Sequence, residues 1–159
     1  MATDDDLRHL RRCVELATAA LEAGDEPFGS VLVAGDGTVR FEDHNHVASG
    51  DRTRHPEFEI ARWAAANLDP AERAAATVYT SGEHCPMCAA AHGWVGLGRI
   101  VYAASSEQLS SWLADLGVPP PPVRPLPIRE VVPGLRVEGP APELTEEVHA
   151  IHRRFHGGS

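Results

Sequence analysis

The sequence lacks any run of about 18 apolar residues, close to the length that an α-helix needs to cross a membrane. It also lacks positive charge at its start, where residues 1–6 read MATDDD and a secretory signal would carry basic residues. The sequence therefore predicts neither a membrane span nor a signal peptide. We expect a cytoplasmic protein without a membrane partner.

Positive charge is scarce in the chain as a whole. There are 14 lysine and arginine residues against 23 aspartate and glutamate residues, which gives a formal net charge of −9. A nucleic-acid-binding surface needs basic side chains that displace counterions from phosphates. Arg153 and Arg154 offer a small basic patch at most. This balance argues against a nucleic acid and favours a small molecule as partner.

Cysteine is also rare, with three residues that cannot all pair within one chain. Cys85 and Cys88 form a Cys-x-x-Cys motif, which favours metal or redox chemistry over a disulfide framework. Cys13 stands apart. It lies beside the apolar stripe of an expected helix, and we interpret it as a small buried hydrophobic residue.

No internal repeat is visible, and 159 residues with 43% apolar composition fit a single domain, residues 1–159, with its own core. Hydrophobic periodicity and turn signals predict an α/β protein in which helices and strands alternate. Helices are expected over residues 7–21, 56–67, 86–95, 109–116 and 142–156, and strands over residues 30–34, 38–41, 77–80 and 100–103.

The expected strand, helix and strand of residues 77–103 form a β-α-β unit. Such a crossover makes two parallel strands, and ligands bind at the carboxyl ends of those strands. Tyr79 and Thr80 therefore lead into a candidate site.

Six of the 13 prolines fall between residues 117 and 127, including four consecutive prolines. Proline excludes a helix or an inner strand there. We expect a semi-rigid connector that carries the last segment across the surface or onto a neighbouring subunit.

Three candidate metal ligands lie at the starts of two expected helices. His55 precedes one helix, and Cys85 and Cys88 begin the next. Imidazole and thiolate are zinc ligands, and three protein ligands leave the fourth tetrahedral position for water, as in catalytic rather than structural zinc sites. Bound zinc lowers the pKa of that water from 15.7 to about 7.

Glu57 lies two residues after His55, near enough to reach the water without binding the metal. Its carboxylate can take the proton of the water and pass it to a leaving amine. General acid and base catalysis of this kind is worth about 10²–10⁴ in rate.

Other interpretations of these residues remain open at this stage. A Cys-x-x-Cys motif alone could be a redox pair, although a redox pair has no need of the upstream His-x-Glu. A structural zinc site would need a fourth ligand, for which His84 and His92 are candidates. Near the C-terminus, His149, His152 and His156 could form a second metal site, but we favour a solvated polar helix face.

The chain resembles the cytidine deaminase-like superfamily, in which a His-x-Glu motif is followed by Pro-Cys-x-x-Cys. It is most similar to bacterial guanine deaminases and related nucleobase deaminases over residues 7–108. The resemblance rests on Pro27-Phe28-Gly29, Asn45, Val47, His55-Pro56-Glu57, Tyr79-Thr80-Ser81, Glu83, Cys85-Pro86-Met87-Cys88, Trp94 and Tyr102-Ala103-Ala104.

The resemblance implies a three-layer α/β/α fold with a central mixed five-stranded sheet, and one zinc ion per chain. It implies that His55, Cys85 and Cys88 bind the zinc and that Glu57 is the proton shuttle. It also implies that Asn45 hydrogen-bonds the substrate ring and that Phe28 and Trp94 line its pocket.

The sequence departs from the pattern of the family at three places. Pro56 replaces the usual alanine and suits the first helical position, while His84 replaces the usual proline. Guanine deaminases carry an aspartate soon after the Tyr-Ala-Ala strand, and Glu107 could take its place here. By the same resemblance, residues 142–156 are expected to pack over an active site, either that of the same chain or that of the other subunit in a homodimer.

The expected reaction is hydrolytic deamination of a small aminated ring such as guanine, cytosine or a triazine. The alternative substrates are a nucleoside (guanosine or cytidine) and adenosine in transfer RNA. A different class of protein, a catalytically silent zinc scaffold, is disfavoured because it would have no use for Glu57.

Overall fold

The computed structural model describes residues 2–157, so Met1 and residues 158–159 of the expected domain lie outside the described part. Its centre is a five-stranded sheet in the order β2-β1-β3-β4-β5. The strands are β1 (Gly29–Val33), β2 (Val39–His44), β3 (Thr77–Gly82), β4 (Ile100–Ala104) and β5 (Val137–Glu138). β1 pairs antiparallel with β2 and β3, whereas β3, β4 and β5 run parallel. The mixed five-stranded sheet is therefore confirmed.

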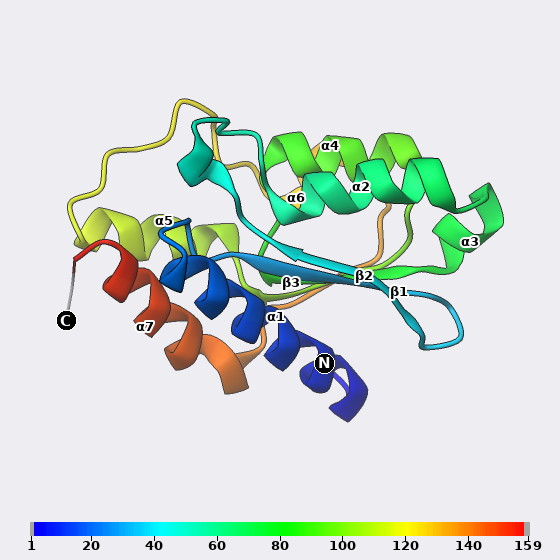
Figure 1. Cartoon of the computed structure of the whole chain (residues 1–159), viewed down its shortest axis with the longest axis horizontal. Helices are drawn as coiled ribbons and strands as arrows, with labels where there is room; N and C mark the ends of the chain where they lie inside the picture. The colour runs from blue at the N-terminus through cyan, green and yellow to red at the C-terminus, as the bar shows by residue number, and fades with distance from the viewer. Residues whose placement is uncertain (1, 158–159) are drawn as a thin grey trace.

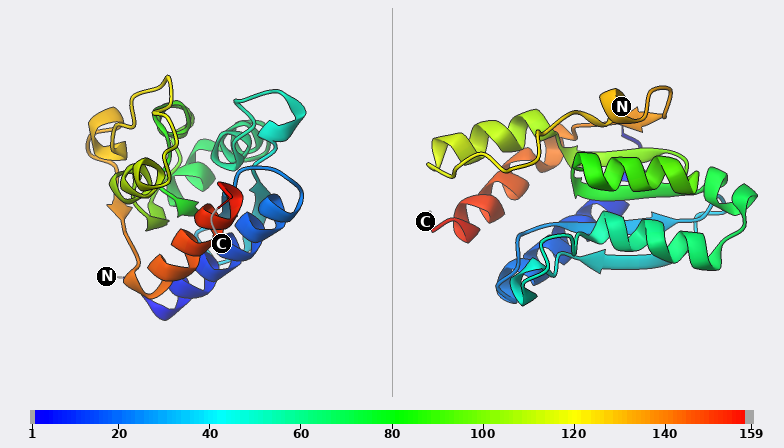
Figure 2. Two further views of the ribbon diagram at one scale, coloured as in Figure 1. Left: turned by 90° about the vertical axis from the view of Figure 1, so that its left-hand side faces the viewer. Right: turned by 90° about the horizontal axis from the view of Figure 1, so that it is seen from above.

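Helices cover both faces of this sheet (Figure 1). The α-helices are α1 (Asp4–Glu22), α2 (Pro56–Asn67), α3 (Pro70–Ala75), α4 (Pro86–Val95), α5 (Ser106–Asp115), α6 (Ile128–Val131) and α7 (Thr145–Phe155), with short 3₁₀ turns η1 (Val47–Ser49) and η2 (Pro142–Leu144). α1 and α7 pack on one face, and α2 and α4 lie side by side on the other (Figures 1 and 2). The three-layer α/β/α architecture is confirmed.

Local sequence signals explain where the main helices begin. Thr3 caps α1 in a reciprocal hydrogen-bonded box with Asp6, and Ser105 caps α5 in the same way with Gln108. α2 and α4 each begin with proline at the first helical position, which needs no N–H donor. The expected start of α5 at residue 109 was wrong by one turn, because this capping box extends the helix to Ser106.

The strands β1 and β4 are buried throughout, and α1 and α7 pack against them. Cys13, on α1, is fully buried, as expected from its place beside the apolar stripe. Gly29 makes this close packing possible, since a Cβ atom there would lie 2.5 Å from the Cys13 carbonyl oxygen. No helix within residues 2–157 is long and apolar enough to cross a membrane.

Candidate active site

His55, Cys85 and Cys88 come together as one cluster, with ligand atoms that lie within 4.8 Å of one another. The Nδ1 atom of His55 is 3.6 Å from the Cys85 sulfur and 3.5 Å from the Cys88 sulfur. With bonds of about 2.3 Å to sulfur and about 2.05 Å to nitrogen, tetrahedral zinc holds such ligands about 3.5 Å apart. The donor set and its spacing therefore fit one zinc ion.

Two helix N-termini position these ligands. His55 is the N-cap residue of α2 and Cys85 is that of α4, and both have extended backbone that turns into the helix. Helix N-termini stabilise negative charge. In the protein without metal, the hydrogen bond with Cys88, assisted by His55, lowers the pKa of the Cys85 thiol to about 4. Cys85 therefore favours the thiolate form that zinc requires, whereas its hydrogen bond and burial raise the pKa of Cys88.

Glu57 lies beside the cluster, in the first turn of α2, and only 6% of it is exposed. Its negative charge contributes to the raised pKa of the Cys88 thiol. On the other side, its Oε1 atom accepts a hydrogen bond of 2.9 Å from Ser30 Oγ. Burial raises the pKa of Glu57 to about 7, so the group can both take and release a proton near neutral pH.

Two strand residues that support Glu57 were given no role in the sequence analysis. Ser30 and Thr80 are fully buried on the adjacent strands β1 and β3, and their hydroxyl oxygens lie 2.9 Å apart. Thr80 donates to the Gly82 carbonyl, which leaves Ser30 as the donor to Glu57. For Ser30, a hydroxyl side chain within the otherwise apolar strand β1 was the available signal.

Glu83 also received no role in the sequence, although it belongs to the quoted motif. Its two carboxylate oxygens accept hydrogen bonds from the backbone N–H groups of Ser106 and Ile128, at 2.9 and 2.8 Å. These groups lie at the starts of α5 and α6. Glu83 therefore anchors two helices to the end of β3, next to Cys85.

Asn45 and Phe28 lie on neighbouring segments at the same edge of β1 and β2. Asn45 is 1% exposed, its N–H donates to the Phe28 carbonyl, and its Oδ1 accepts from the N–H of Val47. The Phe28 ring packs edge-on against His152 of α7, with centroids 5.1 Å apart. A Cβ atom at Gly82 would lie 3.1 Å from this ring, so Phe28 closely covers the end of β3.

Trp94 is not at the cluster within this chain. Its side chain is 91% exposed near the far end of α4, about 13 Å along the helix from Cys85 at a rise of 1.5 Å per residue. Glu107 is exposed in the first turn of α5, and within residues 2–157 it makes no hydrogen bond or ion pair. The structure therefore does not bring these two residues to the ligands, whereas Pro56 is buried directly beside His55.

The other histidines do not complete a four-ligand zinc site. His84 and His92 pack against each other with ring centroids 5.5 Å apart, and His92 bonds the Gly98 carbonyl. Neither belongs to a metal-binding group within the described residues. The fourth ligand that a structural zinc site would require is therefore not supplied by them.

The three histidines of the C-terminal segment also form no metal-binding group among residues 2–157. The interpretation as a solvated face was wrong for His152, which is only 2% exposed. His149 stacks on Trp112 of α5 at 4.4 Å. Burial lowers the pKa of His152 to about 3, so the ring packed against Phe28 is neutral.

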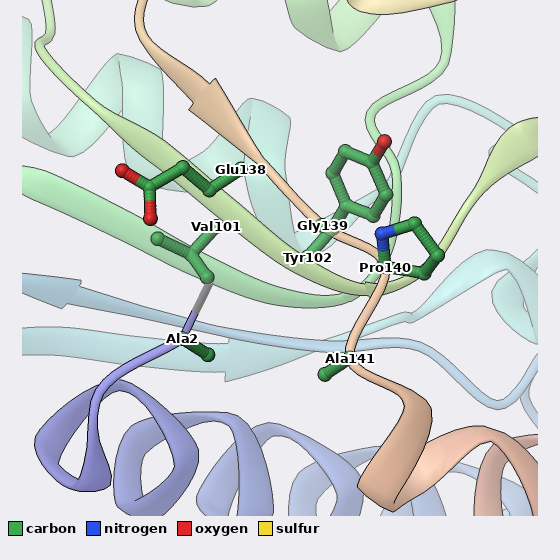
Figure 3. A pocket seen from close by; sticks show the side chains of 7 residues that line it. All are labelled: Ala2, Val101, Tyr102, Glu138, Gly139, Pro140 and Ala141. Atoms are coloured by element: carbon green, nitrogen blue, oxygen red, sulfur yellow. The ribbon is translucent and has the colours of Figure 1, made fainter.

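A separate small hollow lies between β4, β5 and the start of α1 (Figure 3). Its volume is about 90 Å³, and its lining includes Ala2, Tyr102 and Pro140 but none of the cluster residues. Ligand pockets are typically about 300–1,000 Å³. This hollow is therefore too small to be a substrate site.

The zinc cluster and the fold agree with comparisons to known proteins. Residues 3–104 match the family described as "Cytidine and deoxycytidylate deaminase zinc-binding region". The structure of guanine deaminase from Nitrosomonas europaea has the same fold, with a TM-score of 0.73 at 21% identity over 98% of this chain and 86% of that one.

Three relatives are similar in sequence. The probable cytosine deaminase of Schizosaccharomyces pombe is 31% identical over 119 residues, which are 75% of this chain and 72% of that protein. The guanine deaminase of Bacillus subtilis is 39% identical over 97 residues, 60% of this chain and 62% of that protein. The tRNA-specific adenosine deaminase of Haemophilus influenzae is 33% identical over 101 residues, 63% of this chain and 58% of that protein. The chain therefore belongs to the cytidine and deoxycytidylate deaminase family of zinc-binding proteins.

Proposed function

We propose that this protein is a zinc-dependent hydrolase that removes an amino group from a small nucleobase-type ring, such as guanine, cytosine or a triazine, and releases ammonia. The observation that carries the proposal is the buried carboxylate of Glu57 beside a cluster of three zinc ligands. A structural zinc site would not need a buried proton acceptor at this place.

The reaction replaces a carbon–nitrogen bond with a carbon–oxygen bond, with water as the co-reactant. Zinc held by His55, Cys85 and Cys88 would supply a Lewis acid that makes water nucleophilic near neutral pH. Glu57 Oε1 or Oε2 accepts the proton that the water loses and delivers it to the leaving amine. Ser30 orients this carboxylate through its 2.9 Å hydrogen bond.

Side chains around the cluster have the properties of a binding pocket for an aminated ring. Asn45 offers an amide group for hydrogen bonds to ring heteroatoms, and Phe28 offers an apolar ring held by His152. Pro56 fixes the start of α2. Glu107 is exposed in the first turn of α5, so its proposed contact with the substrate has less structural support than those of Asn45 and Phe28.

A small ring is favoured over transfer RNA as substrate. The net charge of −9 repels a polyanion, although a transfer-RNA deaminase is among the relatives. Cytosine and guanine are the substrates named for two other relatives. We therefore propose a free base as the substrate, with a nucleoside such as guanosine or cytidine as the alternative.

The test is ammonia release by the purified zinc protein from guanine, cytosine, melamine, guanosine, cytidine and a transfer-RNA anticodon stem-loop. Release from a base or a nucleoside, at a rate that falls when zinc is chelated and recovers on its return, supports the proposal. Release from the RNA alone would replace it with the transfer-RNA reaction. If the zinc-bound protein releases ammonia from none of them, the proposal is wrong and the protein is a catalytically silent zinc scaffold.

The single domain of residues 1–159, with residues 117–127 as connector, is part of the same proposal. Within it, residues 142–156 act as a cover. In support, His152 of α7 contacts Phe28, and residues 118–127 contain no helix or strand. The contact lies within one chain, so a cover donated by another subunit is not required.

A homodimer is the assembly that we propose. The support is Trp94, an aromatic side chain 91% exposed on α4, of the kind that is enriched in protein interfaces. Light scattering coupled to size exclusion tests it with Trp94→Glu. Dimeric wild type and a monomeric variant are expected, whereas a monomeric wild type would overturn the assembly.

We propose the cytoplasm as its compartment, because reducing conditions keep thiols free for zinc. All three cysteines are free in the structure. Imaging of the tagged full chain in its native cell tests this location.

A further inference from the structure

A second cluster of metal-binding side chains lies outside the candidate active site. Asp25, in the loop between α1 and β1, His44, at the end of β2, and His46 each offer one ligand atom, and these atoms lie within 4.8 Å of one another. We propose that these three residues bind a second divalent transition-metal ion. The hydrogen bonds around them prepare each side chain for this role.

The His44 ring is held in the tautomer that a metal needs. Its Nδ1 atom lies 3.0 Å from the carbonyl oxygen of Asn45. A carbonyl oxygen can only accept, so Nδ1 carries the hydrogen and donates it. The lone pair is then on Nε2, which is free to bind a metal ion.

The His46 ring has the complementary arrangement. Its Nε2 atom lies 2.9 Å from Oδ1 of Asp43, which also accepts a hydrogen bond of 2.9 Å from the N–H of His44. A carboxylate behind an imidazole orients the ring, raises its basicity and leaves the other nitrogen for the metal. Asp43 therefore acts as the supporting carboxylate and Nδ1 of His46 as the ligand.

Asp25 is buried and has one oxygen fixed by the protein. Its Oδ1 accepts a hydrogen bond of 2.8 Å from the N–H of Ala48, which leaves Oδ2 as the ligand. With Asp43 behind His46, two carboxylates are present at the cluster. Together they balance the charge of a dication when both imidazoles are neutral.

Two imidazoles and one carboxylate suit zinc, cobalt, nickel or iron in the divalent state. Ligand atoms about 2.05 Å from a tetrahedral ion lie about 3.3 Å apart, so the cluster must contract by up to about 1.5 Å. The two histidines are only partly buried, and rotation of their side chains can supply this movement. Three protein ligands leave further positions for water.

The position of the cluster gives the ion a structural consequence. Asn45 lies between the two histidines, and the N–H of His46 bonds the carbonyl of Arg54, the residue before His55. An ion bound to Asp25 would connect this turn to the end of α1. Metal binding should therefore stabilise the segment that carries Asn45.

The test is a titration of the full-length protein, already holding one zinc per chain, with Co²⁺. Calorimetry should show one further Co²⁺ per chain, and its near-ultraviolet spectrum should lack a sulfur-to-cobalt charge-transfer band because the ligands are nitrogen and oxygen. His44→Gln and His46→Gln should each weaken this binding at least tenfold. Asp43→Asn should weaken it by about 10–100-fold, the usual effect of losing a supporting carboxylate.

The matched control is His156→Gln, which removes a partly exposed histidine outside the cluster and should leave Co²⁺ binding unchanged. Zinc content and circular dichroism identify any variant that fails to fold. If His44→Gln or His46→Gln unfolds, Asp43→Asn decides, since it keeps both rings. Three outcomes overturn the proposal: no further Co²⁺, unchanged affinity in folded variants, or a charge-transfer band that places the added Co²⁺ on the cysteines.

Discussion

Ser30 and Glu57 are joined by a buried hydrogen bond of 2.9 Å that links the sheet to α2. Ser30 lies in β1, and Glu57 is the second residue of the helix that His55 caps. Two separate elements therefore fix the direction of one carboxylate. A proton shuttle needs this rigidity, because transfer requires heavy atoms within about 2.6–3.2 Å.

Glu57→Gln is expected to lower kcat by about 10²–10⁴ while zinc content stays at one per chain. The amide keeps the shape and the hydrogen bond from Ser30 but cannot take a proton. Steady-state kinetics and metal analysis on the same sample measure both quantities. The control is Glu59→Gln, on the same helix, whose side chain pairs with Arg54 instead. An equal rate in Glu57→Gln and wild type would exclude the proposed role.

Ser30→Ala should reduce kcat by about 10–100-fold with little change in KM. A hydrogen bond to a charged group contributes about 1.5–3 kcal/mol, and about 1.4 kcal/mol corresponds to a factor of ten. Ser81→Ala is the matched control, because Ser81 is equally buried but accepts from the N–H of Gly29 rather than binding Glu57. Equal losses in the two variants would indicate a general packing effect.

Most of the fold could be predicted because its signals are local. Each of these signals lies within one segment: the helical stripe of α1, the prolines at the starts of α2 and α4, and the β-prone runs of β3 and β4. β5 has two residues and α6 has four, so neither is long enough to show a period. Their positions depend on tertiary contacts that no local pattern encodes.

In the candidate site, too, some residues could be identified from local sequence signals and others only from tertiary contacts. His55, Cys85 and Cys88 were recognisable because metal ligands have fixed types and spacings. Ser30 could not be assigned, since its partner Glu57 is 27 residues away. His152 lies four residues after Val148 and thus on the apolar stripe of α7, a signal that its polar type concealed.

His152→Ala should raise KM about 2–10-fold if the Phe28 ring lines the substrate pocket. An edge-to-face aromatic pair contributes about 0.5–1.5 kcal/mol to the position of each ring. His149→Ala, which removes the stacking on Trp112 but not the contact with Phe28, is the control. Steady-state kinetics with the base or nucleoside that is deaminated fastest measure KM. An unchanged KM in His152→Ala would mean that α7 does not contribute to substrate binding.

His84→Met should increase the free energy of unfolding by about 1–3 kcal/mol. His84 is 1% exposed, and neither ring nitrogen has a hydrogen-bond partner among the described residues. An unsatisfied buried polar group costs about this amount, and methionine fills a similar volume without it. Urea denaturation of the zinc-loaded proteins measures the change. A destabilised variant would mean that bound water satisfies the imidazole.

Asp6→Asn should destabilise the protein by about 1.5–3 kcal/mol at pH 7, because it removes the charge from the hydrogen bonds that Asp6 accepts from the partly buried Arg99. The carboxylate of Asp6 accepts two hydrogen bonds from Arg99, at 3.0 and 2.8 Å, and one of 2.7 Å from the Tyr79 hydroxyl. Only 3% of Asp6 and 16% of the Arg99 side chain are exposed. Arg99 also pairs with Glu138, so the bond network ties α1 to β3, β4 and β5.

The same variant predicts a pH dependence with a definite sign. Burial raises the pKa of Asp6, but the hydrogen bonds with Arg99 outweigh it and hold the pKa far below its usual value of 3.8. Above pH 3.8 the carboxylate is charged in both states, and its full contribution to stability is present. As the pH falls below 3.8, the unfolded chain takes up a proton that the folded chain does not, and the contribution declines by about 1.4 kcal/mol per pH unit.

The stability difference between wild type and Asp6→Asn, measured by urea denaturation from pH 7 to pH 3, should therefore be constant down to about pH 4 and then shrink. Glu143→Gln, an exposed change on η2, is the charge-matched control and should show no such difference. A gap between wild type and Asp6→Asn that widened on acidification would mean that Arg99 does not stabilise the charged carboxylate.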